Sequence, residues 1–170
     1  MNKNLKHVAI IPARKNSKGL KNKNRKLFEN TTKFLKKISF FNQVIVASDD
    51  NQIEKKTKKN NFIFFKRSKK NAADNSSIKS LMIEVTQKRN FKKDTVVWLI
   101  YLTLPIKRIK DFKYAYKITK KKNFLSLICF RKVLTHPFDC WIINKKLKKF
   151  IKNDVFRRQD KPEMYEHHHY

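Results

Sequence analysis

The sequence predicts an α/β fold in which a mostly parallel sheet is covered by helices on both faces. Two observations predict it: short continuous apolar runs typical of buried strands, and amphipathic helical patterns that alternate with them along the chain. The 170 residues, 40% of them hydrophobic, suffice for a globular core. We therefore expect residues 1–170 to form a single domain, since no linker-like stretch or internal repeat divides them.

Six apolar runs mark the expected strands. Runs of this length are typical of strands buried on both faces, and the first ends at Pro12. In chain order the predicted strands are Val8–Ile11, Val44–Ala47, Phe62–Phe65, Val96–Tyr101, Phe124–Phe130 and Trp141–Ile143.

Apolar residues at helical spacing predict helices between these strands. The polar segment Arg14–Lys26 holds the only glycine, so we predict a loop there, followed by a short helix over Phe34–Phe41. Ser48–Asp50 offers a start for a polar helix that carries Ile53. Two further amphipathic helices are expected around Ile78–Val85 and Ile109–Tyr116.

Three polar segments follow predicted strands directly. They are the loop after Ile11, the turn Ser48–Asp50 and the segment Tyr101–Lys107. Because ligands of open parallel sheets bind outside the carboxyl ends of the strands, we expect these segments to share one ligand-binding edge.

The net charge of +30 has two readings. Clustered lysines and arginines are typical of nucleic-acid binding. Here, however, the lysines are spread along the whole chain and accompany many Asn, Ile and Phe residues, as in chains from AT-rich genomes. We expect no dedicated nucleic-acid binding, although the charge favours any anionic ligand.

Location and redox state follow from short segments. The apolar run Val8–Ile11 is too short for a signal peptide, and no run approaches the ~20 residues that span a membrane. We therefore expect a cytoplasmic protein without membrane association. Cys129 and Cys140 form no metal-binding spacing and are expected to be reduced thiols.

The loop after the first strand carries the chemistry. Arg14, Lys18 and Lys23 surround Gly19, and several cations with backbone N–H groups are what a polyphosphate requires. The spacing is not that of a P-loop or of a dinucleotide-binding GxGxxG motif. From the residues alone, this loop is either a phosphate site or ordinary basic surface.

Several strings resemble one family. The string Pro-Ala-Arg-Lys-x-Ser-Lys-Gly-Leu-x-x-Lys-Asn, VIVASDD from Val44 to Asp50, Arg67 with the later Ala72 and Asp74–Ser77, His136-Pro137, and Arg-Arg-Gln-Asp-x-Pro from Arg157 occur in this order. Together they resemble the CMP-sialic acid synthetases, cytidylyltransferases for N-acylneuraminate and related nonulosonic acids. The resemblance runs from about residue 8 to about residue 166. It implies a three-layer, Rossmann-like nucleotide-diphospho-sugar transferase fold.

The resemblance also implies ligands and roles. CTP and an acidic sugar would be the substrates, Mg²⁺ the cofactor, and a homodimer the assembly. Arg14 and Lys23 would be catalytic, polarising the triphosphate. The nucleotide would be bound by Ser17, Lys18, Gly19, Asn24, Arg67 and one of Ser76 or Ser77 at the cytosine edge; the sugar would be bound by Tyr101, Arg157, Arg158 and Gln159.

The chain departs from the family pattern in three ways. Tyr101 replaces a glutamine near the sugar, and Lys107 replaces an arginine. The family continues with an acidic pair for Mg²⁺, so we expect this chain to lack C-terminal elements. Asp49 and Asp50 are the remaining candidates for the metal, although helix capping is the preferred reading. The alternatives are a catalytically inactive nucleotide-binding homologue and a basic RNA-binding protein.

Overall fold

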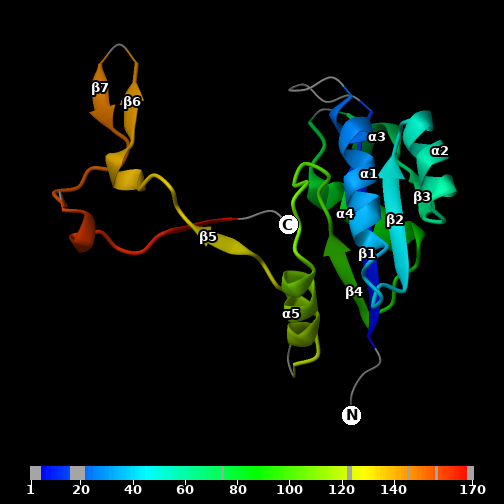
Figure 1. The fold of residues 1–170 in the computed structure, drawn as a ribbon. Helices are drawn as coiled ribbons and strands as arrows, with labels where there is room; N and C mark the ends of the chain where they lie inside the picture. The colour runs from blue at the N-terminus through cyan, green and yellow to red at the C-terminus, as the bar shows by residue number, and fades with distance from the viewer. Residues whose placement is uncertain are drawn as a thin grey trace. The chain divides into compact units, whose positions relative to one another are not determined.

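The computed structural model describes residues 5–15, 22–73, 75–121, 124–144, 146–155 and 157–167. The chain divides into two compact units, Met1–Leu125 and Ser126–His169 (Figure 1). The single domain expected from the length of the chain stays a prediction.

The first unit is built on a parallel sheet of four strands. The strands are β1 (Lys6–Ala13), β2 (Gln43–Ser48), β3 (Ile63–Lys66) and β4 (Thr95–Leu99). Their order is β3-β2-β1-β4, and each neighbouring pair runs parallel. Four of the predicted strands thus occur, and the predicted parallel sheet is confirmed.

Helices cover both faces of this sheet, as predicted (Figure 1). Successive strand side chains point to opposite faces, so β1 feeds two cores. One core joins Ala9 and Ile11 to helices α1, α2 and α5, and the other joins Val8 and Ile10 to helix α4. The helices are α1 (Lys23–Leu35), α2 (Asn51–Lys59), α3 (Lys69–Ala72), α4 (Ile78–Lys88) and α5 (Ile109–Thr119).

The first helix begins and ends earlier than the sequence predicts. The expected loop Arg14–Lys26 and the expected helix Phe34–Phe41 were both wrong in their bounds, since α1 already begins at Lys23 and ends at Leu35. Its first turn is polar, which hides it from an apolar pattern. Ile38 is buried after the helix end, where its N–H donates to the carbonyl oxygen of Leu35.

The second unit contains two antiparallel strand pairs. Strand β5 (Phe130–Lys132) pairs with β8 (Tyr165–His167), and β6 (Trp141–Ile143) pairs with β7 (Leu147–Lys149). The short helices η1 (Pro137–Asp139) and η2 (Arg158–Asp160) lie between them in sequence. None of the described residues from 126 to 167 is buried.

The predicted strand Phe124–Phe130 is therefore wrong. Only Phe130 lies in a strand, and residues 124–129 form no regular structure. The apolar run suggested a strand buried in the parallel sheet, but Leu125 and Ile128 are exposed. The predicted strand Trp141–Ile143 does occur, as part of a hairpin.

Candidate active site

Four segments follow the carboxyl ends of the parallel strands. We call residues 14–25, which include the first turn of α1, the basic loop. The turn Ser48–Asp50 follows β2, residues 67–77 follow β3, and residues 100–107 follow β4. Since all four strands run parallel, the segments follow one edge of the sheet. The shared edge was predicted for the loop after Ile11, the turn Ser48–Asp50 and Tyr101–Lys107, and residues 67–77 join them there.

The basic loop is tied to β2 at its first residues. The Ser48 hydroxyl donates to the carbonyl oxygen of Ala13, the last residue of β1. The Lys15 N–H donates to Asp49 Oδ1 at 2.7 Å. The Asn24 side-chain amide donates to the carbonyl oxygen of Arg14 at 2.8 Å. The predicted nucleotide contact Asn24 thus joins the two ends of the loop.

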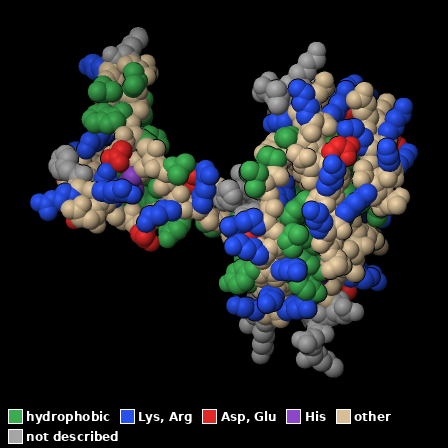
Figure 2. Space-filling view, viewed as in Figure 1, with side chains coloured by type: hydrophobic (Ala, Val, Ile, Leu, Met, Phe, Trp, Pro, Cys, Tyr) green, Lys and Arg blue, Asp and Glu red, His purple; other side chains and the backbone are tan. Residues whose placement is uncertain are grey.

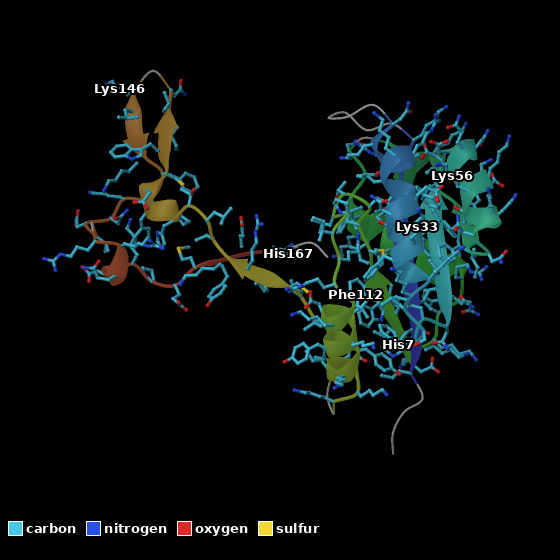
Figure 3. All side chains as sticks on the ribbon, in the orientation of Figure 1. His7, Lys33, Lys56, Phe112, Lys146 and His167 are labelled. Carbon is cyan, nitrogen blue, oxygen red and sulfur yellow. The ribbon has the colours of Figure 1, made fainter. Side chains whose placement is uncertain are left out.

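An ion pair holds the end of the basic loop. Arg25 donates from Nε to Asp50 Oδ2 at 2.6 Å and from its terminal nitrogen to Oδ1 at 3.1 Å. Asp50 is 2% exposed and also accepts from the Gln52 N–H at 2.9 Å, which caps α2. Lys56 Nζ, on α2 beside α1, donates to the Arg25 carbonyl oxygen at 3.3 Å (Figure 3).

The two aspartates therefore have different partners. Burial alone would raise the pKa of Asp50, but hydrogen bonds from Arg25 and Gln52 outweigh it and lower that pKa. Capping is confirmed for Asp50 and wrong for Asp49, whose carboxylate accepts from the loop backbone instead. The pattern VIVASDD showed an acidic pair without showing that the pair is divided between two ends of one loop.

The cations predicted to be catalytic lie at the ends of the basic loop. Arg14 directly follows β1, and Lys23 is the first residue of α1. Helix N-termini present unpaired N–H groups to anions, so the start of α1 adds to the positive potential of the loop. Three predicted nucleotide-binding residues, Ser17, Lys18 and Gly19, lie outside the described residues.

Arg67 is a buried cation next to the basic loop. It follows β3, is 7% exposed, and its N–H donates to the Ser48 carbonyl oxygen at 3.1 Å. Its guanidinium donates to the Asn71 carbonyl oxygen. Burial lowers the pKa of Arg67; Arg14 also lowers it, whereas Asp49 raises it. These electrostatic interactions bring the predicted nucleotide contact Arg67 into the neighbourhood of Arg14.

The two serines predicted to contact cytosine have internal partners. Ser76 Oγ donates to the Asn71 carbonyl oxygen at 2.9 Å. Ser77 Oγ accepts from the Ser80 N–H at 3.0 Å and caps α4. A hydroxyl that donates to a carbonyl can still accept, so Ser76 keeps the capacity to contact a base. The cap is the role that the structure gives Ser77.

The segment after β4 contributes a half-buried tyrosine and lysine. Burial raises the pKa of Tyr101, which was predicted to face the sugar. Lys107 Nζ donates to the Leu104 carbonyl oxygen and to Thr31 Oγ1 of α1 at 3.4 Å. Burial lowers the pKa of Lys107 to about 8. Lys107 thus joins this segment to the helix that follows the basic loop.

The remaining predicted sugar contacts belong to the second unit. Arg157, Arg158 and Gln159 are exposed residues at the start of η2, and the first unit does not contain them. His136 shapes a turn, since its Nδ1 accepts from the Phe138 N–H at 3.2 Å. Sugar binding by Arg157, Arg158 and Gln159 stays a prediction.

Sequence reasoning missed Asn71 and Glu84. Asn71 is 4% exposed and accepts from both Arg67 and Ser76 through its carbonyl oxygen. Glu84 lies on α4 and accepts from the Asn71 side chain at 2.6 Å. No sequence pattern indicates this pair, because the two residues are distant in sequence and neither belongs to a recognised string.

Together, the fold and these segments define a class: an α/β protein with a basic loop at the carboxyl edge of a parallel sheet, the edge at which such folds bind ligands. A family model described as cytidylyltransferase matches residues 8–169. The chain therefore belongs to the cytidylyltransferase family, a family of nucleotidyltransferases. A comparison with curated proteins finds no match.

A solved structure shares this fold. The chain is similar to CMP:2-keto-3-deoxy-manno-octonic acid synthetase complexed with CTP, with a TM-score of 0.68 over 95% of this chain and 71% of that chain. At 16% identity this likeness shows the fold. The family predicted from the sequence is confirmed at the level of cytidylyltransferases, and the sialic acid branch stays a prediction.

Two structural features do not occur among the described residues. None of the helices there is long and apolar enough to cross a membrane. In the same part of the chain, no three His, Cys, Asp or Glu side chains gather in a group that could hold a metal ion.

Proposed function

We propose that this protein transfers CMP from CTP to the anomeric hydroxyl of a 2-keto-3-deoxy sugar acid and releases pyrophosphate. The sugar acid is a sialic acid or a related nonulosonic or octulosonic acid. The observation that carries the proposal is the basic loop, tied to β2 through Asp49 and Asp50 and flanked by Arg67. Family membership and the CTP-bound fold relative support the choice of nucleotide.

In the proposed reaction, the anomeric oxygen of the sugar acid attacks the α-phosphorus of CTP. A new P–O bond forms, the bond from the α-phosphorus to the bridging oxygen breaks, and the hydroxyl proton is lost to solvent or to a base. Negative charge grows on the departing pyrophosphate. We assign Arg14 and Lys23 to neutralise that charge, because preorganised cations are the usual source of catalysis in such transfers.

Mg²⁺ is the cofactor that we propose for this reaction, and Asp49 is the residue whose chemistry fits it. A magnesium ion bound with substrate phosphates needs only one or two protein carboxylates. Asp49 lies at the basic loop and is the carboxylate we assign to it, whereas Asp50 is committed to Arg25 and Gln52. When bound, Mg²⁺ would neutralise phosphate charge beside Arg14 and Lys23.

The acceptor sugar carries a carboxylate, for which arginine is the best partner. A guanidinium grips a carboxylate with two parallel hydrogen bonds. We assign this role to Arg157 and Arg158, with Gln159 contacting a sugar hydroxyl. The sugar contact expected of Tyr101, in the first unit, stays a prediction. Exposure of Arg157 and Arg158 supports the assignment, because exposed guanidinium groups are accessible to a ligand.

We also propose that the protein forms a homodimer through its second unit. Ten of the fourteen exposed large hydrophobic side chains among the described residues lie between Leu127 and Tyr165. Figure 2 shows hydrophobic side chains on the β6–β7 hairpin, which includes Trp141 and Ile143. A hairpin of this size is marginal in water unless another surface packs on it. Analytical ultracentrifugation should show a dimer that Trp141→Ser/Ile143→Ser weakens; a wild-type monomer at high concentration contradicts it.

Calorimetry and turnover together test the proposed function. We expect CTP to bind more tightly than UTP, ATP or GTP, and pyrophosphate release with CTP and at least one acid from a panel of sialic, legionaminic, pseudaminic and Kdo-type acids. Equal binding of all four nucleotides, weakening only with salt, would indicate nonspecific charge binding. Selective CTP binding without pyrophosphate release would indicate an inactive homologue.

A further inference from the structure

Glu84 is the centre of a polar network beneath residues 67–77. Its side chain is 10% exposed. It accepts hydrogen bonds from the Ser68 N–H at 3.2 Å, the Ser68 hydroxyl at 3.1 Å and the Asn71 amide at 2.6 Å. Lys88 Nζ donates to Glu84 Oε1 at 2.8 Å. A carboxylate can only accept, so these donors all stabilise its charged form.

The network determines where Asn71 lies. Asn71 belongs to α3, a single turn of four residues that could not persist alone in water. Ser68 Oγ accepts from the Asn71 N–H at 3.3 Å. The Asn71 side-chain amide donates to Glu84 at 2.6 Å and, over a longer 3.5 Å, to the Ser80 carbonyl oxygen. Without Glu84, the Asn71 amide and the Ser68 N–H would lose an acceptor in a poorly hydrated place.

The Asn71 carbonyl oxygen in turn orients two predicted nucleotide contacts. It accepts from the Arg67 guanidinium and from the Ser76 hydroxyl. Arg67 Nε is buried and has no hydrogen-bond partner among the described atoms, so the position of this side chain depends on its terminal nitrogens and on packing. Glu84 therefore acts on Arg67 and Ser76 through Asn71, which Ser68 helps to hold.

We propose that Glu84 is a positioning residue for nucleotide-base selection, which holds Arg67 and Ser76 in place through Asn71 and Ser68. This inference rests on the proposed function. The hydrogen-bond partners of Glu84 described above, Ser68, Asn71 and Lys88, lie outside the basic loop. Its removal should therefore weaken binding of the base and spare binding of the phosphates.

The electrostatics of Glu84 agree with this role. Burial alone would raise the pKa of Glu84, but hydrogen bonds from Lys88, Asn71 and Ser68 outweigh burial and lower it. Because the folded pKa is lowered, the stabilisation is present at neutral pH and is lost as the pH falls through that folded value. The network is therefore intact at pH 7.

Glu54 provides a matched control. It lies on α2 and pairs with Lys58 four residues later at 2.6 Å, as Glu84 pairs with Lys88 at 2.8 Å. Glu54→Ala removes the same kind of helical ion pair without touching residues 67–77. Any difference between Glu84→Ala and Glu54→Ala therefore reports the contacts to Ser68 and Asn71.

The experiment compares CTP, UTP and inorganic tripolyphosphate as ligands of the full chain at pH 7 by calorimetry. We expect Glu84→Ala to raise the Kd for CTP at least about tenfold, the usual consequence of losing a hydrogen bond to a charged group. The preference for CTP over UTP should fall, and the Kd for tripolyphosphate should stay within about twofold, as for Glu54→Ala. Glu84→Gln, which keeps an acceptor for Asn71 but turns an amide toward Ser68, should be intermediate.

Three outcomes overturn the inference. Glu84→Ala could behave like Glu54→Ala, or weaken CTP and tripolyphosphate equally, which would indicate a general loss of structure. If Glu84→Ala does not fold, Glu84→Gln decides, and an unchanged CTP preference in that variant refutes the role. Failure of the proposed function is distinguishable, because the wild-type chain itself would then show no preference for CTP.

Discussion

The basic loop and the 67–77 segment lie along one edge of the sheet but are held differently. The basic loop is tied at its two ends: Asp49 accepts from Lys15, and Asp50 pairs with Arg25. The 67–77 segment is held from below by the buried network around Asn71 and Glu84. The basic loop thus carries cations and is held at its ends, whereas the 67–77 segment carries polar groups and is held by a buried network.

This difference teaches what each segment is suited to recognise. The described ends of the basic loop carry Arg14 and Lys23, and the attraction of such cations for a triphosphate is not strongly directional. In the 67–77 segment, Ser68, Asn71 and Ser76 are held by hydrogen bonds, and base selection requires hydrogen-bonding groups at defined positions. Changes in the loop anchors should therefore affect all triphosphates, and changes below residues 67–77 should affect the choice of base.

The largest expected effect follows from breaking the anchor of the basic loop. Asp50→Ala leaves Arg25 without its carboxylate and α2 without its cap, which should lower the free energy of unfolding by ~2–4 kcal/mol. Urea denaturation measures this loss. Asp111→Ala, which breaks the more exposed pair with Arg108, should cost below about 1 kcal/mol. Equal losses for the two variants would show that Asp50 is an ordinary surface acid.

The second prediction concerns the cations of the loop. Arg14→Ala or Lys23→Ala should weaken the binding free energies of CTP and UTP equally, by about 1.5–3 kcal/mol, since each removes a charge-assisted contact to phosphate. Calorimetry checks this, with Lys58→Ala, an exposed lysine of α2, as the control. If all three variants bind alike, the basic loop is ordinary surface. If only the affinity for CTP falls and that for UTP does not, the basic loop takes part in base selection, and the proposed difference between the two segments is wrong.

The third prediction concerns the pH dependence of stability. Residues 100–107 are held by Lys107, whereas the basic loop and the 67–77 segment are held by carboxylates, so the three segments respond to pH in different ranges. Burial lowers the pKa of Lys107 to about 8. Burial thus penalises the charged form, so folding is less favourable below about pH 8 and this penalty is relieved between about pH 8 and the unfolded value of about 10.5.

We therefore expect the free energy of unfolding to rise by about 1–2 kcal/mol between pH 7 and 9.5 because of Lys107. Urea denaturation at both pH values measures the rise, and Lys107→Met should remove it. The carboxylates of Asp50 and Glu84 stay charged across this range, so their variants should keep the rise. A Lys107→Met variant with an unchanged pH response would refute the assignment.

The smallest effect separates the two serines of the 67–77 segment. Ser77→Ala removes the cap of α4 and should cost about 1 kcal/mol of unfolding free energy with little change in CTP affinity. Ser77→Asn, another good cap, should restore stability. Ser76→Ala should have the opposite effects: it should weaken CTP binding and leave thermal stability near that of the wild type. A loss of CTP affinity in Ser77→Ala would instead indicate that Ser77 contacts the cytosine edge.

Much of the first unit could be predicted because its signals are local. Continuous apolar runs marked β1 to β4, and the parallel order placed the basic loop, the Ser48–Asp50 turn and residues 100–107 at one edge. The polar first turn of α1 and the exposed run Phe124–Phe130 misled the same reasoning. An apolar pattern reports burial only when the segment is in fact buried, and Leu125 is 94% exposed.

By itself, the sequence determined the class of fold, the cytidylyltransferase family and the residue types of the site, because strand periodicity and short ordered motifs are written in consecutive residues. Only the tertiary structure decided that Asp49 and Asp50 are divided between the two ends of the basic loop. It also decided that Glu84 supports Asn71. Hydrogen bonds between residues far apart in the chain depend on how helices pack on the sheet, and no local pattern encodes that packing.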